Sequence, residues 1–419
     1  MDSMAAPLPL PALERLVAAL IAAELNAGGR RLNGAEVARW DGAQRLDAEG
    51  LALDSLELLA CGAAVNAFFH LHESGIEDML LLERTIAGWA GLVHRAQQEG
   101  FARLTFTTSG STGTPKPCTH DIATLEEEVA FFAGRFAGRG RVVALVPPHH
   151  IYGFLFTVLL PRRLDVPLLD ARGLSAGALR RALRGDDLLV AHPTSLLVLQ
   201  RSLGGLPNGL LVTSSTAPLP ATLHAAMRAM GAAEIMEIYG SSETAGIATR
   251  TTAEGPFHLL PRWRAGGAEE DASVVERATG REFPLPDRAT WPSARALHLN
   301  GRKDEAVQVG GVNIFPRELE ARLRALPGVA DCALRLDTSL PEPRLKAFVV
   351  PAQPAQGAAL VAEVEAHCRS HWSAPERPVR IAHGPALPRS AMGKPRDWNR
   401  DEEDVALEGV FTNSRDAAA

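Results

Sequence analysis

The sequence contains only four cysteines among its 419 residues, at Cys61, Cys118, Cys332 and Cys368. They lie far apart, and neither a Cys-x-x-Cys pair nor a Cys/His cluster with zinc-ligand spacing occurs. This pattern excludes a disulfide framework and a structural zinc site. We expect four free thiols in a reducing compartment, which predicts a cytoplasmic protein.

Long apolar runs and basic clusters are also lacking. No apolar run reaches the roughly 18 residues that a membrane-spanning helix requires, and residues 1–12 lack the basic start and apolar stretch of a secretory signal. The formal net charge is −6, and no stretch of lysine and arginine resembles a nucleic-acid-binding patch. The composition therefore predicts neither a membrane protein nor a nucleic-acid-binding protein.

Lysine is scarce, because arginine supplies most of the positive charge. The four lysines are Lys116, Lys303, Lys346 and Lys394, and the two tyrosines are Tyr152 and Tyr239. The compact ammonium group of lysine suits phosphates and carboxylates, and arginine does not replace it freely. The retained lysines are therefore candidates for contacts with anionic groups.

The first hundred residues differ in charge from the rest of the chain. Residues 1–100 contain fourteen acidic and seven basic residues, whereas the remainder is nearly neutral. Apolar residues recur at helical spacing over 11–25, 54–69 and 84–97. This spacing predicts a small all-α bundle as a domain of its own.

Beyond residue 100, short β-rich runs alternate with helical stretches. The runs lie at 104–107, 142–146, 188–191, 209–213 and 233–238, with helical stretches at 124–136 and 220–230. This alternation predicts an α/β domain with a parallel sheet over 101–302. Residues 256–300, rich in proline and arginine, are expected to be irregular.

The last part of the chain predicts a small α+β domain over 303–402. Its helical stretches lie at 316–326 and 360–371, and its strand-like runs at 332–336 and 347–350. Residues 403–419 are polar and then alanine-rich, so we expect a flexible tail.

One glycine- and hydroxyl-rich segment carries the strongest chemical signal. It consists of Thr107, Thr108, Ser109, Gly110, Ser111, Thr112, Gly113, Thr114, Pro115 and Lys116. Small residues let backbone N–H groups approach an anion, hydroxyl groups add donors, and Lys116 adds a positive charge. The spacing is neither that of the Walker A motif nor that of the dinucleotide-binding glycines. By itself the segment is either a phosphate-binding loop or a polar surface loop.

Five further segments follow this loop in order. They are 148–153 (Pro-His-His-Ile-Tyr-Gly), 214–219 (Ser-Ser-Thr-Ala-Pro-Leu), 239–244 (Tyr-Gly-Ser-Ser-Glu-Thr), 301–304 (Gly-Arg-Lys-Asp, with Gly310-Gly311 after it) and 388–394 (Pro-Arg-Ser-Ala-Met-Gly-Lys). The six segments resemble the motifs of the adenylate-forming superfamily, which includes acyl- and aryl-CoA synthetases, peptide-synthetase adenylation domains and luciferases. The resemblance implies a shortened adenylate-forming α/β large domain and a small, mobile α+β C-terminal domain.

The resemblance implies ATP and Mg²⁺ as cofactors and assigns the phosphate contacts. Lys116 would hold the β- and γ-phosphates together with the loop residues Thr108, Ser109, Gly110, Ser111, Thr112 and Gly113. Glu243 would bind Mg²⁺, a hard cation that prefers oxygen ligands. Lys394 would bridge the substrate carboxylate and the α-phosphate, where charge builds up during adenylation.

The resemblance also assigns the nucleoside and acyl contacts. Tyr239 would stack on adenine, and Asp287 and Arg302 would fix the ribose. The family's Thr-Gly-Asp is replaced here by Leu-Pro-Asp at 285–287, so only the acid is retained. The other nucleotide contacts are Ser215, Thr216, Gly240 and Thr244. The acyl pocket would be lined by His150, Tyr152, Gly153 and Ser241.

The resemblance further implies that the C-terminal domain rotates about a hinge at Asp304 between an adenylating and a thioester-forming arrangement. Lys394 serves only the first of these. Gly310 and Gly311 would line the tunnel for a pantetheine arm, where side chains would obstruct the thiol.

The N-terminal region departs from the family. Asp54-Ser55-Leu56 resembles the Asp-Ser-Leu motif of acyl carrier proteins, in which the serine bears phosphopantetheine. Three interpretations remain open: Ser55 carries phosphopantetheine and the ligase loads its own carrier; the domain is carrier-like but Ser55 only caps a helix; or these helices complete the ligase core.

The 150–153 segment is most similar to that of aryl-acid ligases, which favours a hydroxybenzoate- or cinnamate-like acid over an aliphatic one. The resemblance implies that the acyl acceptor is a phosphopantetheine thiol, on CoA, a separate carrier protein or the chain's own carrier-like domain. Two alternative functions are a carrier or scaffold with an inactive ligase part, and an acyl-AMP ligase that uses a non-thiol acceptor.

Overall fold

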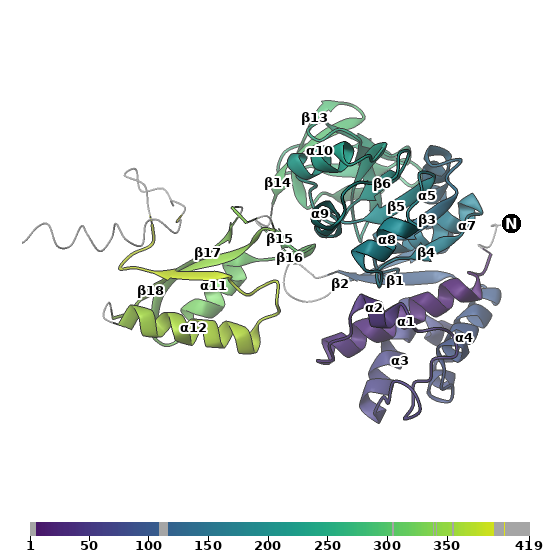
Figure 1. The fold of residues 1–419 in the computed structure, drawn as a ribbon, viewed down its shortest axis with the longest axis horizontal. Helices are drawn as coiled ribbons and strands as arrows, with labels where there is room; N and C mark the ends of the chain where they lie inside the picture. Colours follow the sequence, from purple (N-terminus) through teal and green to yellow (C-terminus); the bar gives the residue numbers. More distant parts are fainter. Residues whose placement is uncertain are drawn as a thin grey trace, which may run out of the picture. The chain divides into compact units, whose positions relative to one another are not determined.

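The computed structural model describes residues 6–108, 116–303, 306–337, 339–340, 342–353, 356–388 and 398. The chain divides into two compact units, unit 1 (Met1–Gly301) and unit 2 (Arg302–Ala419) (Figure 1). This division lies one residue from the boundary predicted at 302/303. No division between compact units falls at residue 100.

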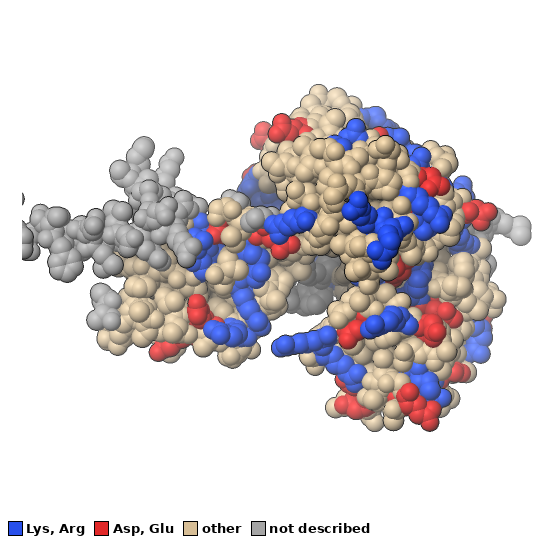
Figure 2. Space-filling model, in the orientation of Figure 1, with Lys and Arg blue, Asp and Glu red and all other residues tan. Residues whose placement is uncertain are grey.

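Unit 1 begins with helices. They are α1 (Leu10–Ala27), α2 (Gly34–Val37), α3 (Ser55–Phe69), the 3-10 turns η1 (Leu71–Glu73) and η2 (Glu77–Leu81), and α4 (Ile86–Gln98). The predicted N-terminal helices are therefore confirmed. Acidic side chains in this region alternate with arginines, as Figure 2 shows, and include the ion pairs Arg30–Glu57 and Arg45–Asp47.

The remaining helices and strands of unit 1 form its α/β part. Its first strands are the antiparallel hairpin β1 (Arg103–Thr108) and β2 (Lys116–Asp121). The helical segments are α5 (Ile122–Arg135), α6 (Ile151–Phe154), the π-helical η3 (Leu155–Leu159), α7 (Leu160–Leu164), α8 (Ala176–Ala182), α9 (Pro193–Ser202) and α10 (Ala221–Ala229).

A nine-stranded sheet is the centre of unit 1. Its strands are β3 (Arg141–Ala144), β4 (Leu168–Asp170), β5 (Asp187–Ala191), β6 (Leu211–Ser214), β7 (Glu234–Ser241), β8 (Ala245–Arg250), β9 (Phe257–Leu259), β13 (Asp287–Ser293) and β14 (Ala296–Arg302). The order is β13-β14-β9-β8-β7-β6-β5-β3-β4. Strands β4, β3, β5, β6 and β7 are mutually parallel, whereas β7–β8, β8–β9 and β9–β14 are antiparallel.

The parallel strands are buried on both faces. Because successive side chains point to opposite faces, Val142 and Leu188 join one hydrophobic cluster while Val143 and Leu189 join another. Helices α8, α9 and α10 contribute to the second cluster. Double burial explains why these strands are almost continuously apolar in sequence.

The first cluster is shared with the N-terminal helices. Leu16 of α1 and Trp89 of α4 have no solvent exposure, and they belong to the same cluster as Phe106 of β1, Phe156 of η3 and Ile247 of β8. A shared core predicts that these helices and the sheet unfold together. It fits the interpretation in which the helices complete the ligase core.

Residues 256–300 are not irregular, and this prediction was wrong. They contain β9, β13 and β14 of the large sheet and a small sheet of β10 (Trp263–Ala265), β11 (Ser273–Glu276) and β12 (Glu282–Pro284). Most of these strands have three or four residues. Such strands are too short for a period-two pattern to stand out against the surrounding prolines and arginines.

Unit 2 confirms the small α+β domain. Its elements are β15 (Val307–Val309), β16 (Val312–Ile314), α11 (Pro316–Arg324), β17 (Val329–Asp337), β18 (Arg344–Pro351), α12 (Gly357–His371) and β19 (Arg380–His383). Strand β18 lies between antiparallel β17 and parallel β19. The ammonium group of the buried Lys346 donates to the carbonyl of Trp398 at 2.8 Å.

Gly310 and Gly311 form the two-residue turn between β15 and β16, where Val309 pairs with Val312. Both glycines have positive φ, 60° and 82°. A tight hairpin turn with two residues in the left-handed region favours glycine at both positions. The pair therefore has a local structural reason, independent of any role in a pantetheine tunnel.

Within the described part of the chain, no helix combines the length and the hydrophobicity needed to cross a bilayer. All four cysteines are free and buried.

The shared core leads to a stability prediction. Leu16→Ala should lower the free energy of unfolding of unit 1 by about 3 kcal/mol, because it removes fully buried methyl groups. The loss should appear as one cooperative transition in urea, followed by far-UV circular dichroism. Leu56→Ala, the same change at a side chain with 77% exposure on α3, is the control and should leave the midpoint almost unchanged. A separate early transition for residues 1–100 would contradict a shared core.

Candidate active site

Three of the sequence motifs lie at the carboxyl ends of parallel strands of the large sheet. Segment 148–153 follows β3, segment 214–219 begins at the last residue of β6, and segment 239–244 begins within β7. These strands are parallel, so their carboxyl ends meet at the same edge. Ligands of open α/β sheets bind at this edge, and the sheet thereby brings together segments that are far apart in sequence.

The phosphate-loop segment joins the two strands of a hairpin. Thr108 at the end of β1 pairs with Lys116 at the start of β2, and the Lys116 side chain is exposed. Ser109, Gly110, Ser111, Thr112 and Gly113 lie outside the described residues. The sequence predicts a helix directly after the loop, but β2 intervenes before α5. Because its residues are mostly polar and exposed, the sequence of β2 shows no strand pattern.

The charges of Lys116 and Glu243 both influence the pKa of the Cys118 thiol. Burial raises the pKa of Cys118 on β2 to about 11; the charge of Glu243 raises this pKa further and that of Lys116 lowers it. The hairpin strand is also joined to the Glu243 segment by His120, whose Nε2 lies 2.6 Å from the Ser242 carbonyl oxygen. The cationic and anionic residues assigned to phosphate and magnesium therefore lie in one neighbourhood.

The turn between β7 and β8 carries most of the nucleotide motif. Glu243 is exposed on this turn, whereas Thr244 is buried. The Thr244 hydroxyl pairs with the Ser241 hydroxyl at 3.0 Å and donates to the Ala245 carbonyl at 3.1 Å. Gly240 is exposed and borders a register shift in the β7–β8 ladder. Thr244 thus stabilises the turn from within, while Glu243 remains exposed.

Tyr239 and Asp287 meet although 48 positions separate them. The tyrosine hydroxyl donates to Asp287 Oδ2 at 2.8 Å, and both side chains are half-buried. Tyr239 is near the end of β7, and Asp287 begins β13 at the far edge of the same sheet. The pair joins the residues assigned to adenine and ribose.

Ser215 and Thr216 follow β6, next to β7. The Ser215 hydroxyl donates to the Ile238 carbonyl at 2.8 Å and is buried, so it connects the two strand ends. Thr216 is exposed with a φ of 75°. A left-handed residue other than glycine costs about 1–3 kcal/mol, and such strain is enriched at functional sites.

The 148–153 segment lies beyond β3, and its residues are not all open to a ligand. The Tyr152 hydroxyl is buried against the Ala191 carbonyl and the Thr213 hydroxyl, at 3.1 and 2.8 Å. A side chain at Gly153 would collide with the Pro147 carbonyl, since its Cβ would lie 1.9 Å from that oxygen. His150 is exposed at the start of α6. Of these residues, His150 presents the most surface to a substrate.

His149, beside His150, is a residue that motif matching did not single out. Its Nδ1 is buried without a hydrogen-bond partner. Burial, with His150 and Arg172 nearby, lowers the pKa of His149 well below its ordinary value. It is therefore neutral at pH 7, and its unpaired nitrogen can accept or donate a hydrogen bond.

The other assigned residues are not brought into this neighbourhood by unit 1. Arg302 ends β14 and is half-buried, and Ser55 is exposed at the start of α3. Asp304 and Lys394 lie outside the described residues. Gly310 and Gly311 belong to unit 2.

Comparisons with known proteins agree with these motifs. The family model described as "AMP-binding enzyme" matches residues 92–288, and the model of the C-terminal domain of such enzymes matches 318–394. The chain belongs to the AMP-binding enzyme family. It is an AMP-forming acid–thiol ligase, as the six motifs predict.

Two curated relatives extend this result over nearly the whole chain. A 4-coumarate–CoA ligase of Halorhodospira halophila is 38% identical over 384 residues, which cover 91% of this chain and 97% of the relative. A 4-coumarate–CoA ligase of Rhodobacter capsulatus is 38% identical over 396 residues, covering 92% and 100%. The alignments leave out less than a tenth of this chain, so they include most of the N-terminal helices.

Solved structures share the fold. An amide bond synthetase from Marinactinospora thermotolerans superposes with a TM-score of 0.56, 19% identity and 94% coverage of both chains. A malonyl-CoA ligase superposes with a TM-score of 0.52, 23% identity and coverage of 68% and 71%. This confirms the predicted adenylate-forming α/β fold.

The Tyr239–Asp287 pair leads to a prediction about nucleotide binding. Asp287→Ala should raise the KM for ATP about tenfold, because a charged acceptor for a ribose hydroxyl is lost. The KM for the carboxylic acid should change little. Steady-state pyrophosphate release measures both values. Asp271→Ala, which removes an exposed carboxylate of the same unit, is the control; equal ATP constants in the two variants would rule out the ribose assignment.

Proposed function

We propose that this protein activates a cinnamate-like aromatic acid with ATP and transfers the acyl group to CoA. The observation that carries the adenylating half is the hydrogen bond between Tyr239 and Asp287, and it is supported by the nearness of both Lys116 and Glu243 to Cys118. The aromatic acid and the CoA acceptor rest on the two 4-coumarate–CoA ligases that are 38% identical over nearly the full length.

The residues assigned to ATP and to the acid suit the steps of the reaction. Lys116 attracts the terminal phosphates, and the exposed Glu243 can hold a hydrated Mg²⁺ through oxygen. Bound Mg²⁺ supplies positive charge against the phosphates. Tyr239 and Asp287 hold the nucleoside at a constant position. Lys394 then stabilises the charge that develops when the acid carboxylate attacks the α-phosphate.

The neutral His149 and the exposed His150 are proposed to border the acyl site. Both follow β3 at the same sheet edge as the nucleotide residues. An aromatic ring packs well against imidazole rings, which here lie with centroids 4.3 Å apart. This supports an aromatic acid, as the sequence motif predicts.

For the acceptor, we favour CoA over a carrier domain within the chain. The N-terminal helices share their core with the sheet and are part of the aligned length of the CoA ligases. Ser55 is the first residue of α3, and the preceding Asp54 caps this helix, reciprocated by Glu57. The Asp-Ser-Leu sequence therefore has a helix-capping explanation. A cytoplasmic location, supported by four free buried thiols, completes the proposal.

The adenylation step is tested with Lys394→Ala. This variant should release pyrophosphate at least about a hundredfold more slowly with ATP and 4-coumarate, because transition-state charge loses a pre-positioned cation. It should still convert pre-formed coumaroyl-adenylate and CoA to the thioester, which serves as an internal control for folding. Unimpaired pyrophosphate release would contradict the assignment. Loss of both half-reactions would contradict a role confined to adenylation.

The acceptor is tested at Ser55. Ser55→Ala should form coumaroyl-CoA at the wild-type rate, and intact mass spectrometry after incubation with a phosphopantetheinyl transferase should show no adduct on the wild type. A pantetheine adduct that is absent from Ser55→Ala, followed by an acyl adduct, would establish self-loading instead. Transfer to amines in place of CoA would support the non-thiol alternative.

A further inference from the structure

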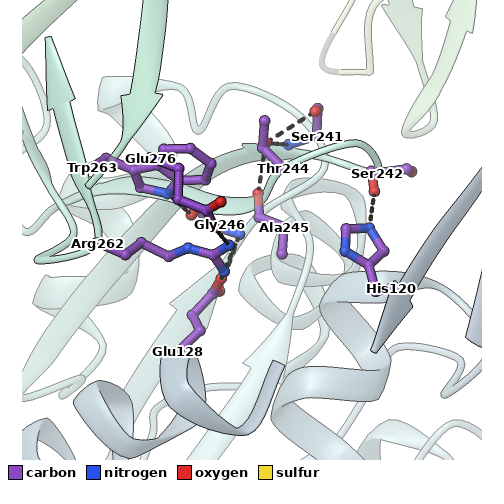
Figure 3. A network of polar contacts seen from close by, with 10 residues as sticks. All are labelled: His120, Glu128, Ser241, Ser242, Thr244, Ala245, Gly246, Arg262, Trp263 and Glu276. Atoms are coloured by element: carbon purple, nitrogen blue, oxygen red, sulfur yellow. Dashed lines mark hydrogen bonds and ion pairs between the residues drawn. The ribbon is translucent and has the colours of Figure 1, made fainter. Parts of the chain in front are cut away.

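A fully buried carboxyl group lies beneath the turn that carries Glu243. Glu128 of α5 accepts from the backbone N–H of Gly246 through both oxygens, at 3.0 and 3.1 Å (Figure 3). Its side chain has no solvent exposure. Burial raises the pKa of Glu128 to about 8, although Arg262 and the Gly246 N–H lower it in part. A carboxyl group is costly to bury in this way, so a specific role is expected of it.

Gly246 is held from both sides by side chains of distant elements. Its N–H donates to Glu128, and its carbonyl accepts from the Trp263 indole at 2.7 Å. Arg262 extends this network, with one guanidinium nitrogen 3.6 Å from Glu128 and another 2.5 Å from Glu276. A Cβ at position 246 would lie 2.4 Å from the Glu128 oxygen, so a side chain there would displace the Glu128 carboxyl group.

The other end of the turn is held by His120. Because the Ser242 carbonyl is an acceptor, His120 Nε2 carries the proton of this 2.6 Å contact. Burial lowers the pKa of His120, so the ring is neutral at pH 7. His120 is on β2, which begins at Lys116. The contact therefore joins the strand of the phosphate loop to the turn of Glu243 across 122 positions.

The turn between these two contacts is strained. Ala245 has a φ of 57°, in the left-handed region that residues other than glycine rarely adopt. Such a conformation persists only where the surroundings determine it strongly. Here the Thr244 hydroxyl donates to the Ala245 carbonyl within the turn. Glu128 and Trp263 bind the backbone of Gly246 at one end, and His120 binds the Ser242 carbonyl at the other (Figure 3).

We propose that Glu128 and His120 are positioning residues that hold the two ends of the 242–246 turn and thereby aim Glu243 at Mg²⁺. Neither residue contacts the substrate in this role. Each acts through a backbone group of the turn, and loss of either contact lets Glu243 adopt other directions. The inference rests on the metal-binding role proposed for Glu243.

The test measures the Mg²⁺ dependence of pyrophosphate release at saturating ATP and 4-coumarate. Glu128→Leu and His120→Phe should each raise the half-saturating Mg²⁺ concentration about tenfold, the factor expected for one lost charge-assisted or buried hydrogen bond. The KM for 4-coumarate should stay within about twofold of the wild type, because His149 and His150, proposed to border the acyl site, follow β3 and not β7. Glu128→Gln retains a carbonyl oxygen for the Gly246 N–H and should restore most of the Mg²⁺ affinity.

A matched control and the choice of readout separate positioning from loss of fold. Glu127→Leu makes the same change at the exposed neighbour on α5 and should leave the Mg²⁺ dependence unchanged. A variant that only destabilises the fold lowers the active fraction but not the Mg²⁺ affinity of the remaining enzyme. If Glu128→Leu does not fold, His120→Phe and Glu128→Gln still carry the test.

A double-mutant cycle distinguishes this inference from the proposed function. In a Glu243→Gln background, Glu128→Leu should cause no further rise in the Mg²⁺ requirement, because both changes act through one side chain. Additive effects would overturn the positioning role while leaving the ligase assignment intact. If Glu243→Gln alone leaves the Mg²⁺ dependence unchanged, the metal-binding role itself is wrong. An unchanged Mg²⁺ dependence in both Glu128→Leu and His120→Phe would overturn the inference directly.

Discussion

Burial of the parallel strands on both faces is the constraint on which the rest of this structure depends. Strands β3, β5, β6 and β7 are largely buried, and helices or further core residues cover each side. Polar chemistry is therefore confined to the strand ends, where backbone and side chains are free to bind ligands. The three motifs at the ends of β3, β6 and β7 are therefore brought together by the packing of the sheet itself.

The same packing explains which parts of the fold could be predicted from the sequence. The doubly buried strands and the amphipathic helices α1, α5 and α12 have strong hydrophobic patterns, and their sequence-based bounds lie within a few residues of those observed. Strands β2 and β9–β14 lack such patterns, because they depend on partners elsewhere in the chain. Their pairing is a tertiary property, which local sequence does not encode.

In the candidate site, too, residues with a local sequence signal could be predicted, whereas contacts that depend on tertiary pairing could not. Asp287 could be predicted from its distance to the hinge motif, but its contact with Tyr239 could not, since it depends on how β13 and β7 are arranged in the sheet. Glu128 was missed because Glu126, Glu127 and Glu128 together have the appearance of a solvated helix face. A signal was present, however: Leu125 and Phe132 lie three before and four after Glu128, which puts the acid on the apolar face of α5.

The N-terminal helices illustrate why a short motif is weaker evidence than a shared core. Asp54-Ser55-Leu56 is both a carrier-protein signature and a good helix start, and the capping box of Asp54 and Glu57 satisfies the second explanation completely. What separates the explanations is where the helices bury their apolar faces. A carrier domain that visits an active site must keep its own core, because it has to detach from the ligase. Here Leu16 and Trp89 are buried in one cluster with residues of the sheet, so detachment would expose apolar surface on both parts. The cost of that exposure argues that these helices are a fixed part of the ligase.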